Sequence, residues 1–208
     1  MSNLFNDLYF KILTLPGIII GLSFHEFAHA WMSNKLGDPT PKMQGRLTVN
    51  PLAHVDLIGF VCLLICGFGW GKPVMIDPRY YKKRRRDELL VSVAGVVMNL
   101  LIAILFSFPA KWLYSAYATS GNTLFDTMFY ICLYIVQINL CLMIFNLIPV
   151  PPLDGWGIVT QVVDLEKYRW YPYVYQYGGW FLLILILFNV TDIVLMPCIN
   201  FFMNILFF

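Results

Sequence analysis

The segment His25-Glu26-Phe27-Ala28-His29 combines residue types and a spacing that suit metal-dependent hydrolysis. In a helix, positions i and i+4 share one face, so the imidazoles of His25 and His29 can bind a single metal ion. Glu26 is rotated by about 100° from His25, where its carboxylate can take a proton from a water molecule activated by the metal. The H-E-x-x-H pattern therefore predicts a catalytic zinc site. A buried His/Glu hydrogen-bond cluster is the structural alternative.

Two histidines leave a catalytic zinc ion short of its usual three protein ligands. Asp154 is the strongest candidate for the third, because it follows a proline-rich stretch, residues 146–152, that would unwind the end of an apolar helix. Unwound backbone at membrane depth is tolerated only where protein or a wet cavity surrounds it. One zinc ion held by His25, His29 and Asp154 is the prediction, and a helix N-cap is the alternative role for Asp154.

The elements that must position these residues have the composition of a membrane protein. Of the 208 residues, 59% are hydrophobic and 12% are charged, against about 45–50% and about 25% in soluble domains. This nearly excludes a soluble enzyme and excludes a disordered chain, while the net charge of +2 excludes a globally basic nucleic-acid-binding protein. The predicted fold is all-α and polytopic, a bundle of about four to six transmembrane helices.

Apolar runs predict where the spans lie. Residues 57–68 are too short to cross a bilayer, so a small re-entrant, interfacial or strand-containing segment is expected there. Glycines that alternate with Phe68 and Trp70 favour a loop or strand. The tail Pro197–Phe208 is too short to cross alone. The predicted spans are Leu8–Leu36, Leu89–Pro109, Leu124–Ile148 and Tyr171–Leu195, with a polar turn region over Lys111–Asp126.

The basic residues predict the orientation of the bundle. Half of the 14 lysines and arginines lie between residues 72 and 88, so this loop is expected to be cytoplasmic, as is the loop 35–46. Both loops can share that side only if residues 52–71 dip in and return. The cluster Lys82–Arg86 is predicted to contact anionic lipid headgroups, with docking of a partner protein as the alternative.

These motifs resemble those of the site-2 protease family of intramembrane zinc metalloproteases. Residues 45–56 and 69–74 are similar to a small bacterial and archaeal branch, in which no PDZ domain is expected. Val96 departs from the family element G-x-x-x-N, which usually has proline after the glycine. The resemblance is carried by His25–His29, by Gly95-Val96-Val97-Met98-Asn99 and by Asn146-xx-Pro149-xxx-Leu153-Asp154-Gly155.

The resemblance implies a single metalloprotease domain over residues 1–208, with a catalytic core at about 15–165 and an additional span and tail, in a prokaryotic cell membrane. It implies hydrolysis of peptide bonds in or near the transmembrane segments of membrane-protein substrates, as in regulated intramembrane proteolysis, with Glu26 as general base. Asn99 and Asn146 are expected to position the substrate or the oxyanion. Interhelical hydrogen bonds are the alternative for both.

Two other function classes fit part of the sequence. A metal-binding membrane transporter also needs intramembrane His, Glu and Asp, but it predicts them along a path through several spans. A proteolytically silent scaffold would normally lack Glu26 or a ligand. His54 and Asp56 fit either partners of the metal ligands or a turn, and the turn is favoured. The sequence specifies neither the substrate nor the oligomeric state.

Overall fold

The computed structural model describes residues 2–66 and 69–208, and the predicted all-α architecture is confirmed for them. These residues form helices and no strand, apart from one antiparallel bridge between Val55 and Gly71. The expected glycine alternation at Gly67 and Phe68 lies outside the described residues. The elements are α1 (Ser2–Lys35), α2 (Thr40–Met43), α3 (Pro51–His54), α4 (Leu57–Cys66), η1 (Pro78–Tyr80), α5 (Arg84–Ser120), α6 (Thr123–Asn146), α7 (Asp154–Val163), η2 (Leu165–Lys167), α8 (Tyr171–Leu187) and α9 (Val190–Phe207).

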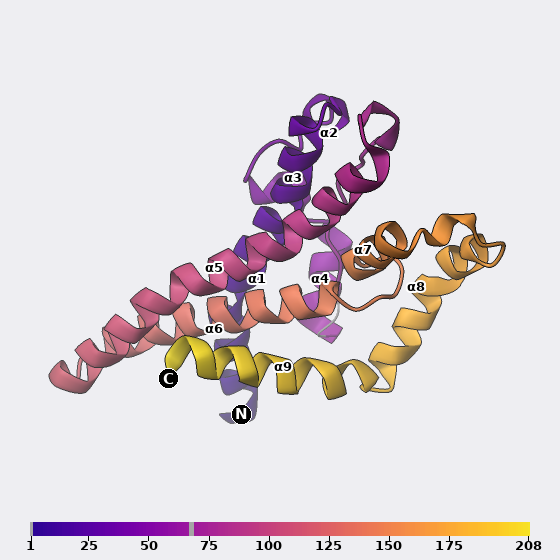
Figure 1. The fold of residues 1–208 in the computed structure, drawn as a ribbon. Coiled ribbons are helices and arrows are strands. Elements are labelled where there is room, and N and C mark those ends of the chain that lie inside the picture. Colours follow the sequence, from indigo (N-terminus) through magenta and orange to yellow (C-terminus); the bar gives the residue numbers. More distant parts are fainter. Residues whose placement is uncertain (1, 67–68) are drawn as a thin grey trace.

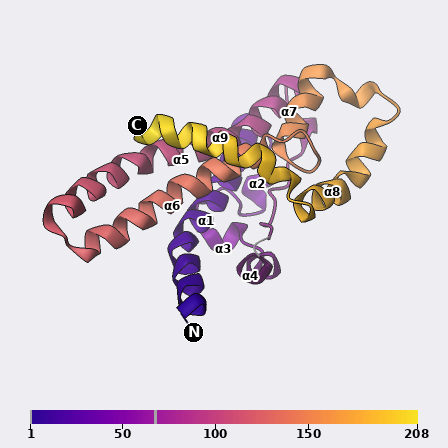
Figure 2. The same cartoon turned by 90° about the horizontal axis from the view of Figure 1, so that it is seen from below.

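Four of the described helices are long and apolar enough to cross a membrane: α1, α5, α6 and α9. The chain is therefore a polytopic membrane protein. Helices α5 and α6 form a long antiparallel hairpin, α1 packs against both of them, and α9 lies along the hairpin (Figures 1 and 2). The buried apolar side chains gather where α5, α6 and α9 meet, around Val136 and Leu140.

The hairpin differs from the expected boundaries. Helix α5 continues through Pro109 to Ser120, so most of the predicted polar turn region is helical. The turn itself is Gly121–Asn122, where Gly121 adopts a left-handed backbone conformation (φ 63°) and the Asn122 side chain caps the start of α6. A proline inside a membrane helix is tolerated because neighbouring groups satisfy the freed carbonyl.

The prediction of one span over residues 171–195 is wrong. Helix α8 ends at Leu187 and α9 begins at Val190. Asn189 stands at the break in the left-handed conformation (φ 54°), which asparagine tolerates better than most residues. The tail Pro197–Phe208 is consequently the second half of an 18-residue helix, and α9 is the C-terminal candidate span.

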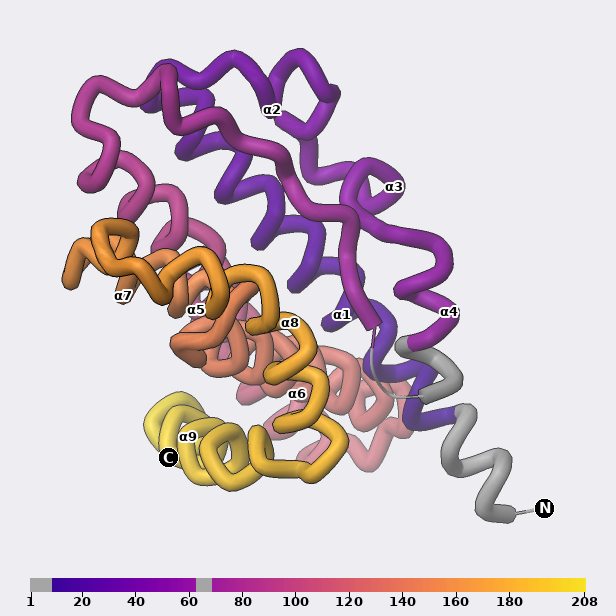
Figure 3. Tube along the Cα trace, turned by 90° about the vertical axis from the view of Figure 1, so that its right-hand side faces the viewer, coloured from indigo at the N-terminus to yellow at the C-terminus, as the bar shows by residue number. Residues whose placement is uncertain are grey.

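Val55 and Gly71, which flank α4 in the sequence, lie side by side. The Val55–Gly71 bridge and a hydrogen bond from the Lys72 N–H to the His54 carbonyl (2.7 Å) join the two ends. Between them α4 has ten residues, about 15 Å of helix, too short to span. The chain then runs extended beside α1 toward α2 (Figure 3).

His54 and Asp56 form the turn favoured by the sequence. The buried His54 ring bonds the Thr48 carbonyl through Nε2 (2.7 Å), and Asp56 Oδ1 accepts a hydrogen bond from the Gly59 N–H at the start of α4 (2.8 Å). Neither residue belongs to the metal-ligand cluster described below.

A buried cluster of hydrogen bonds around Asp38, which we call the Asp38 knot, fixes the extended segment against the end of α1. Asp38 accepts hydrogen bonds from Ser33 Oγ, from the Thr40 N–H and from the Asp77 N–H, each at 2.8–2.9 Å. Burial opposes ionisation of Asp38, but these hydrogen bonds outweigh it and hold its pKa below the ordinary value of an aspartate. The Tyr81 hydroxyl completes the knot at 2.7 Å from Ser33 Oγ.

Small residues let α1 approach α6 closely. Gly17, Gly21, His25 and His29 are spaced by four and form one row along α1. A Cβ at Gly17 would lie 3.1 Å from the Ile135 Cα and from the Tyr134 carbonyl oxygen, both backbone atoms of α6. Glycines at such a spacing are typical of close helix contacts in membranes. The row therefore places both histidines at the interface between α1 and the hairpin.

We predict that Gly17→Ala destabilises the bundle by about 1–3 kcal/mol, because the added methyl group must push two backbones apart. Gly179→Ala is the matched control, since a Cβ at this α8 position meets nothing within 4 Å; it should be neutral or stabilise by up to about 1 kcal/mol. Thermal unfolding of the purified proteins in detergent measures both. Equal midpoints for the two variants would contradict the close α1–α6 contact.

Candidate metal centre

The structure brings the three predicted ligands together. His25 and His29 project from one face of α1, and Asp154 begins α7. The two Nε2 atoms lie 3.0 Å apart, His25 Nε2 lies 3.2 Å from Asp154 Oδ2, and His29 Nε2 lies 3.3 Å from Asp154 Oδ1. Their side chains are no more than 17% exposed. They are the described His, Cys, Asp and Glu residues that gather closely enough to hold a metal ion.

The outer nitrogen of each ring is held by an acceptor. His25 Nδ1 lies 2.6 Å from Asn99 Oδ1, and His29 Nδ1 lies 2.8 Å from the Val91 carbonyl oxygen. An oxygen acceptor at Nδ1 requires that Nδ1 carries the proton of the neutral ring. Both Nε2 atoms then present lone pairs to each other and to the carboxylate. Three acceptor atoms that face one another in this way form a site for a cation.

The donor set fits a zinc ion. Zinc takes imidazole nitrogens at about 2.0–2.1 Å and carboxylate oxygens at about 2.0–2.2 Å in tetrahedral geometry, which separates neighbouring ligand atoms by about 3.3–3.5 Å. The observed separations of 3.0–3.3 Å are close to that range. Histidine ligands whose other nitrogen is hydrogen-bonded to protein oxygen are the usual arrangement in zinc sites. Three protein ligands leave a position for water or substrate, as in catalytic centres.

Gly95 explains why α5 can lie against the ligand atoms. A Cβ at this position would be 2.5 Å from His29 Nε2 and 2.7 Å from His25 Nε2. The glycine of the G-x-x-x-N element thus leaves room for the imidazoles, and the asparagine four residues later lies on the same face of α5.

Asp154 reaches the site because the chain turns back tightly after α6. The backbone of Gly155 packs onto the end of that helix, and a Cβ there would lie 2.3 Å from the Leu147 carbonyl oxygen. Glycine is therefore required directly after the ligand. The alternative role of Asp154 as a helix cap does not apply, because it is the first residue of α7 and the cap position is Leu153.

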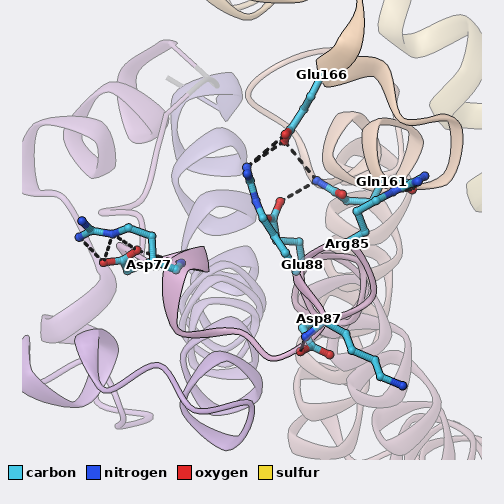
Figure 4. Close-up of polar contacts among 9 residues, drawn as sticks. Asp77, Arg85, Asp87, Glu88, Gln161 and Glu166 are labelled. Atoms are coloured by element: carbon cyan, nitrogen blue, oxygen red, sulfur yellow. Dashed lines mark hydrogen bonds and ion pairs between the residues drawn. The ribbon is translucent and has the colours of Figure 1, made fainter.

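The far end of α7 is fastened to the start of α5 by a charged cluster that the sequence does not reveal (Figure 4). Arg85 donates to the Gln161 carbonyl (2.7 Å), and the Gln161 amide donates to Glu88 (2.6 Å). Arg84 links Glu88 (2.7 Å) to Glu166 (3.1 Å). The ten-residue α7 thus carries a ligand at one end and is anchored at the other, which restricts where Asp154 can lie.

Glu26 faces the extended segment that crosses α1. Its Oε2 accepts a hydrogen bond from the Val74 N–H at 3.0 Å. The segment is held beside it by the Lys72 N–H bond to His54 and by the Asp77 N–H bond to Asp38. The carboxylate next in sequence to His25 therefore lies beside the backbone of this segment.

The two asparagines predicted to contact substrate are placed differently. Asn99 is fully buried, and its amide is used within the protein: Oδ1 meets His25, and Nδ2 donates to the Gly21 carbonyl (3.2 Å) and to Asn139 Oδ1 (2.9 Å). The alternative of interhelical hydrogen bonds therefore describes Asn99. Asn146 donates to the Leu142 carbonyl of its own helix (2.9 Å) and does not contact the ligands in this arrangement. Asn139 was not identified from the sequence, although a buried amide in a span is itself a signal.

Comparison with known proteins agrees with this geometry. The sequence profile of peptidase family M50 matches residues 110–188. A Bacillus subtilis protein named "Putative zinc metalloprotease YwhC" is 37% identical over 201 residues, which cover 93% of this chain and 90% of that protein. Proteins named "Putative zinc metalloprotease Rip2" from Mycolicibacterium smegmatis and Mycobacterium tuberculosis are each 28% identical over 182 residues, which cover 85% of this chain and 66% and 67% of their own lengths. No solved structure matches the chain. The chain therefore belongs to peptidase family M50, the site-2 protease family, and is an integral-membrane zinc metalloprotease.

Proposed function

We propose that this metalloprotease hydrolyses peptide bonds in or near transmembrane segments of membrane-protein substrates, as in regulated intramembrane proteolysis. One observation carries the proposal: two of the three ligand residues and Glu26 lie inside α1, a candidate span, and the third ligand is brought to them by a turn that follows another candidate span, α6. A reaction at this centre takes place at the membrane.

Each residue of the site has a separate role in the proposed hydrolysis. His25, His29 and Asp154 would hold the zinc ion, which when bound would supply a Lewis acid to acidify water and polarise the scissile carbonyl. Glu26 accepts the proton of the attacking water and then delivers it to the leaving amine. The hydrogen bonds at the outer ring nitrogens place the proton of each neutral imidazole on Nδ1 and orient both Nε2 atoms toward the metal position.

An apolar cavity beside α1 supports an apolar substrate. It has a volume of about 440 Å³ and is lined by α1, α4 and α6, including Ile18, Leu22, Phe60 and Leu142. Leu22 is one helical turn from His25. Side chains of a transmembrane segment suit this lining, because it offers few polar groups.

The segment 71–77 is the candidate contact for an unwound substrate backbone, by strand addition. The Lys72 N–H is already bonded to the His54 carbonyl of α3, and the Val74 N–H to Glu26 of α1. An added strand would therefore pair with the opposite edge, where Pro73 has no N–H to donate. Such pairing is short and weak by itself, so apolar side-chain contacts must supply most of the binding.

The orientation and lipid contacts remain part of the proposal. The loops 35–46 and 72–88 meet at the Asp38 knot, which supports placing both on the cytoplasmic side, together with the centre. Within Lys82–Arg86, Arg84 and Arg85 form ion pairs with acidic residues of the chain. Contact with anionic headgroups is therefore assigned mainly to Lys82, Lys83 and Arg86, which are exposed.

We predict that Glu26→Gln reduces cleavage of a co-expressed membrane-protein substrate by about 10²–10⁴-fold, because the variant keeps the shape of the side chain and removes the base. The purified variant should retain zinc at the wild-type stoichiometry. Asp126→Asn, which alters a carboxylate beside the distant hairpin turn, is the control and should cleave normally. Cleavage at the wild-type rate by Glu26→Gln would remove Glu26 from the base role.

We also predict that Gly95→Ala abolishes zinc binding, because the new methyl group would occupy the space of the ligand nitrogens. Zinc content of the purified protein, measured by elemental analysis, should fall from one ion per chain toward zero. Gly179→Ala carries the same substitution where space is open and should keep its zinc. One full equivalent of zinc in Gly95→Ala would show that the ion binds elsewhere.

A further inference from the structure

We propose that Asn139 is a positioning residue for the metal centre and acts through Asn99. Three hydrogen bonds follow one another from α1 through α5 to α6, and in each of them the donor lies on the α1 side. Asn139 Nδ2 donates to the Ile135 carbonyl (2.8 Å), Asn99 Nδ2 donates to Asn139 Oδ1 (2.9 Å), and His25 Nδ1 donates to Asn99 Oδ1 (2.6 Å). We call these three bonds the Asn139 relay. Its last donor belongs to a zinc ligand, so the inference rests on the zinc site above.

Backbone carbonyls fix the direction of the Asn139 relay. A carbonyl only accepts hydrogen bonds, so the atom of Asn139 that faces the Ile135 carbonyl must be its nitrogen. The same argument applies to Asn99 and the Gly21 carbonyl. Both amide oxygens must then point toward His25.

Because the two asparagines are buried, their amide groups depend on the hydrogen bonds of the relay. Asn99 and Asn139 are 0% exposed, and a buried amide has no water to replace a lost partner. Gly21 provides the space, because a Cβ there would lie 3.2 Å from Asn139 Oδ1. The glycines of α1 thus leave room both for the contact with α6 and for the hydrogen-bonded pair Asn99–Asn139.

The relay has a chemical consequence beyond helix packing. Without the Asn139 acceptor, only the longer bond from Asn99 Nδ2 to the Gly21 carbonyl (3.2 Å) holds the Asn99 amide in its orientation, so a flip of the amide costs less free energy. A flipped Asn99 presents N–H groups to His25 Nδ1, which must then accept, and the ring proton moves to Nε2. A protonated Nε2 cannot bind a metal.

The chain has three histidines, so ¹⁵N-histidine NMR of the metal-free protein in detergent reads each tautomer directly. We expect a proton on Nδ1 of His25 and of His29, and on Nε2 of His54, because each of these nitrogens faces an oxygen acceptor. Asn139→Leu should convert His25 partly or wholly to Nε2–H and leave His29 and His54 unchanged. Asn146→Leu is the matched control: it makes the same substitution on the same helix, where the amide bonds only its own backbone.

Zinc affinity, measured by competition with a chelator, provides the second readout. Asn139→Leu should bind zinc about 10-fold more weakly than Asn146→Leu, in the range found for partners of ligating histidines. Asn139→Asp keeps an oxygen toward Asn99 and should retain the wild-type His25 tautomer, so it tests the relay if the leucine variant does not fold. A wild-type tautomer and wild-type affinity in Asn139→Leu, or a changed tautomer in Asn139→Asp, would overturn the inference.

The two proposals fail in different ways. If the wild-type protein binds no zinc, the proposed function is wrong, while the tautomer comparison in the metal-free protein still decides the relay. If the wild-type protein binds zinc and the two leucine variants behave alike, the relay is wrong and the metal site stands.

Discussion

Two imidazole nitrogens and a carboxylate, held within 3.3 Å of one another with their lone pairs directed inward, form the constraint on which the rest of the structure depends. Such a cluster can bind a cation only if protein contacts hold its three acceptor atoms in place. The Asn99 and Val91 oxygens fix the two rings, and the anchored α7 fixes Asp154. Three helices and one tight turn therefore meet at a single point.

The glycines allow the helices to approach one another closely. Gly17 and Gly21 bring α1 against α6, Gly95 brings α5 against the ligand atoms, and Gly155 folds α7 back onto the end of α6. In a bilayer, where apolar side chains gain little by leaving lipid, close packing and buried hydrogen bonds hold helices together. The same small residues thus serve both the stability of the bundle and the assembly of its metal site, and substitutions there should affect both.

The sequence predicted those features whose signal lies within one segment. The i, i+4 spacing of His25 and His29 predicted a shared face, and the proline-rich approach to Asp154 predicted a turn at depth. It was less informative where partners come from distant helices. The contacts of Asn99 with His25 and Asn139 cross three helices, so its type and spacing did not distinguish a substrate contact from a structural one. The break at Asn189 has only a short signal in the sequence, the polar residues Asn189, Thr191 and Asp192 within a run that is otherwise apolar. Arg84 and Arg85 belong to a basic cluster that indicates lipid binding, so the sequence did not show that these two arginines anchor α7.

The central claim is that one zinc ion is bound by His25, His29 and Asp154. Zinc X-ray absorption spectroscopy of the purified protein tests it most directly, because the spectrum reports the ligand atoms. We expect imidazole nitrogen and oxygen neighbours at about 2.0–2.2 Å and no sulfur, and the loss of one protein oxygen ligand in Asp154→Ala. Sulfur neighbours at about 2.3 Å, or a spectrum unchanged by Asp154→Ala, would contradict it.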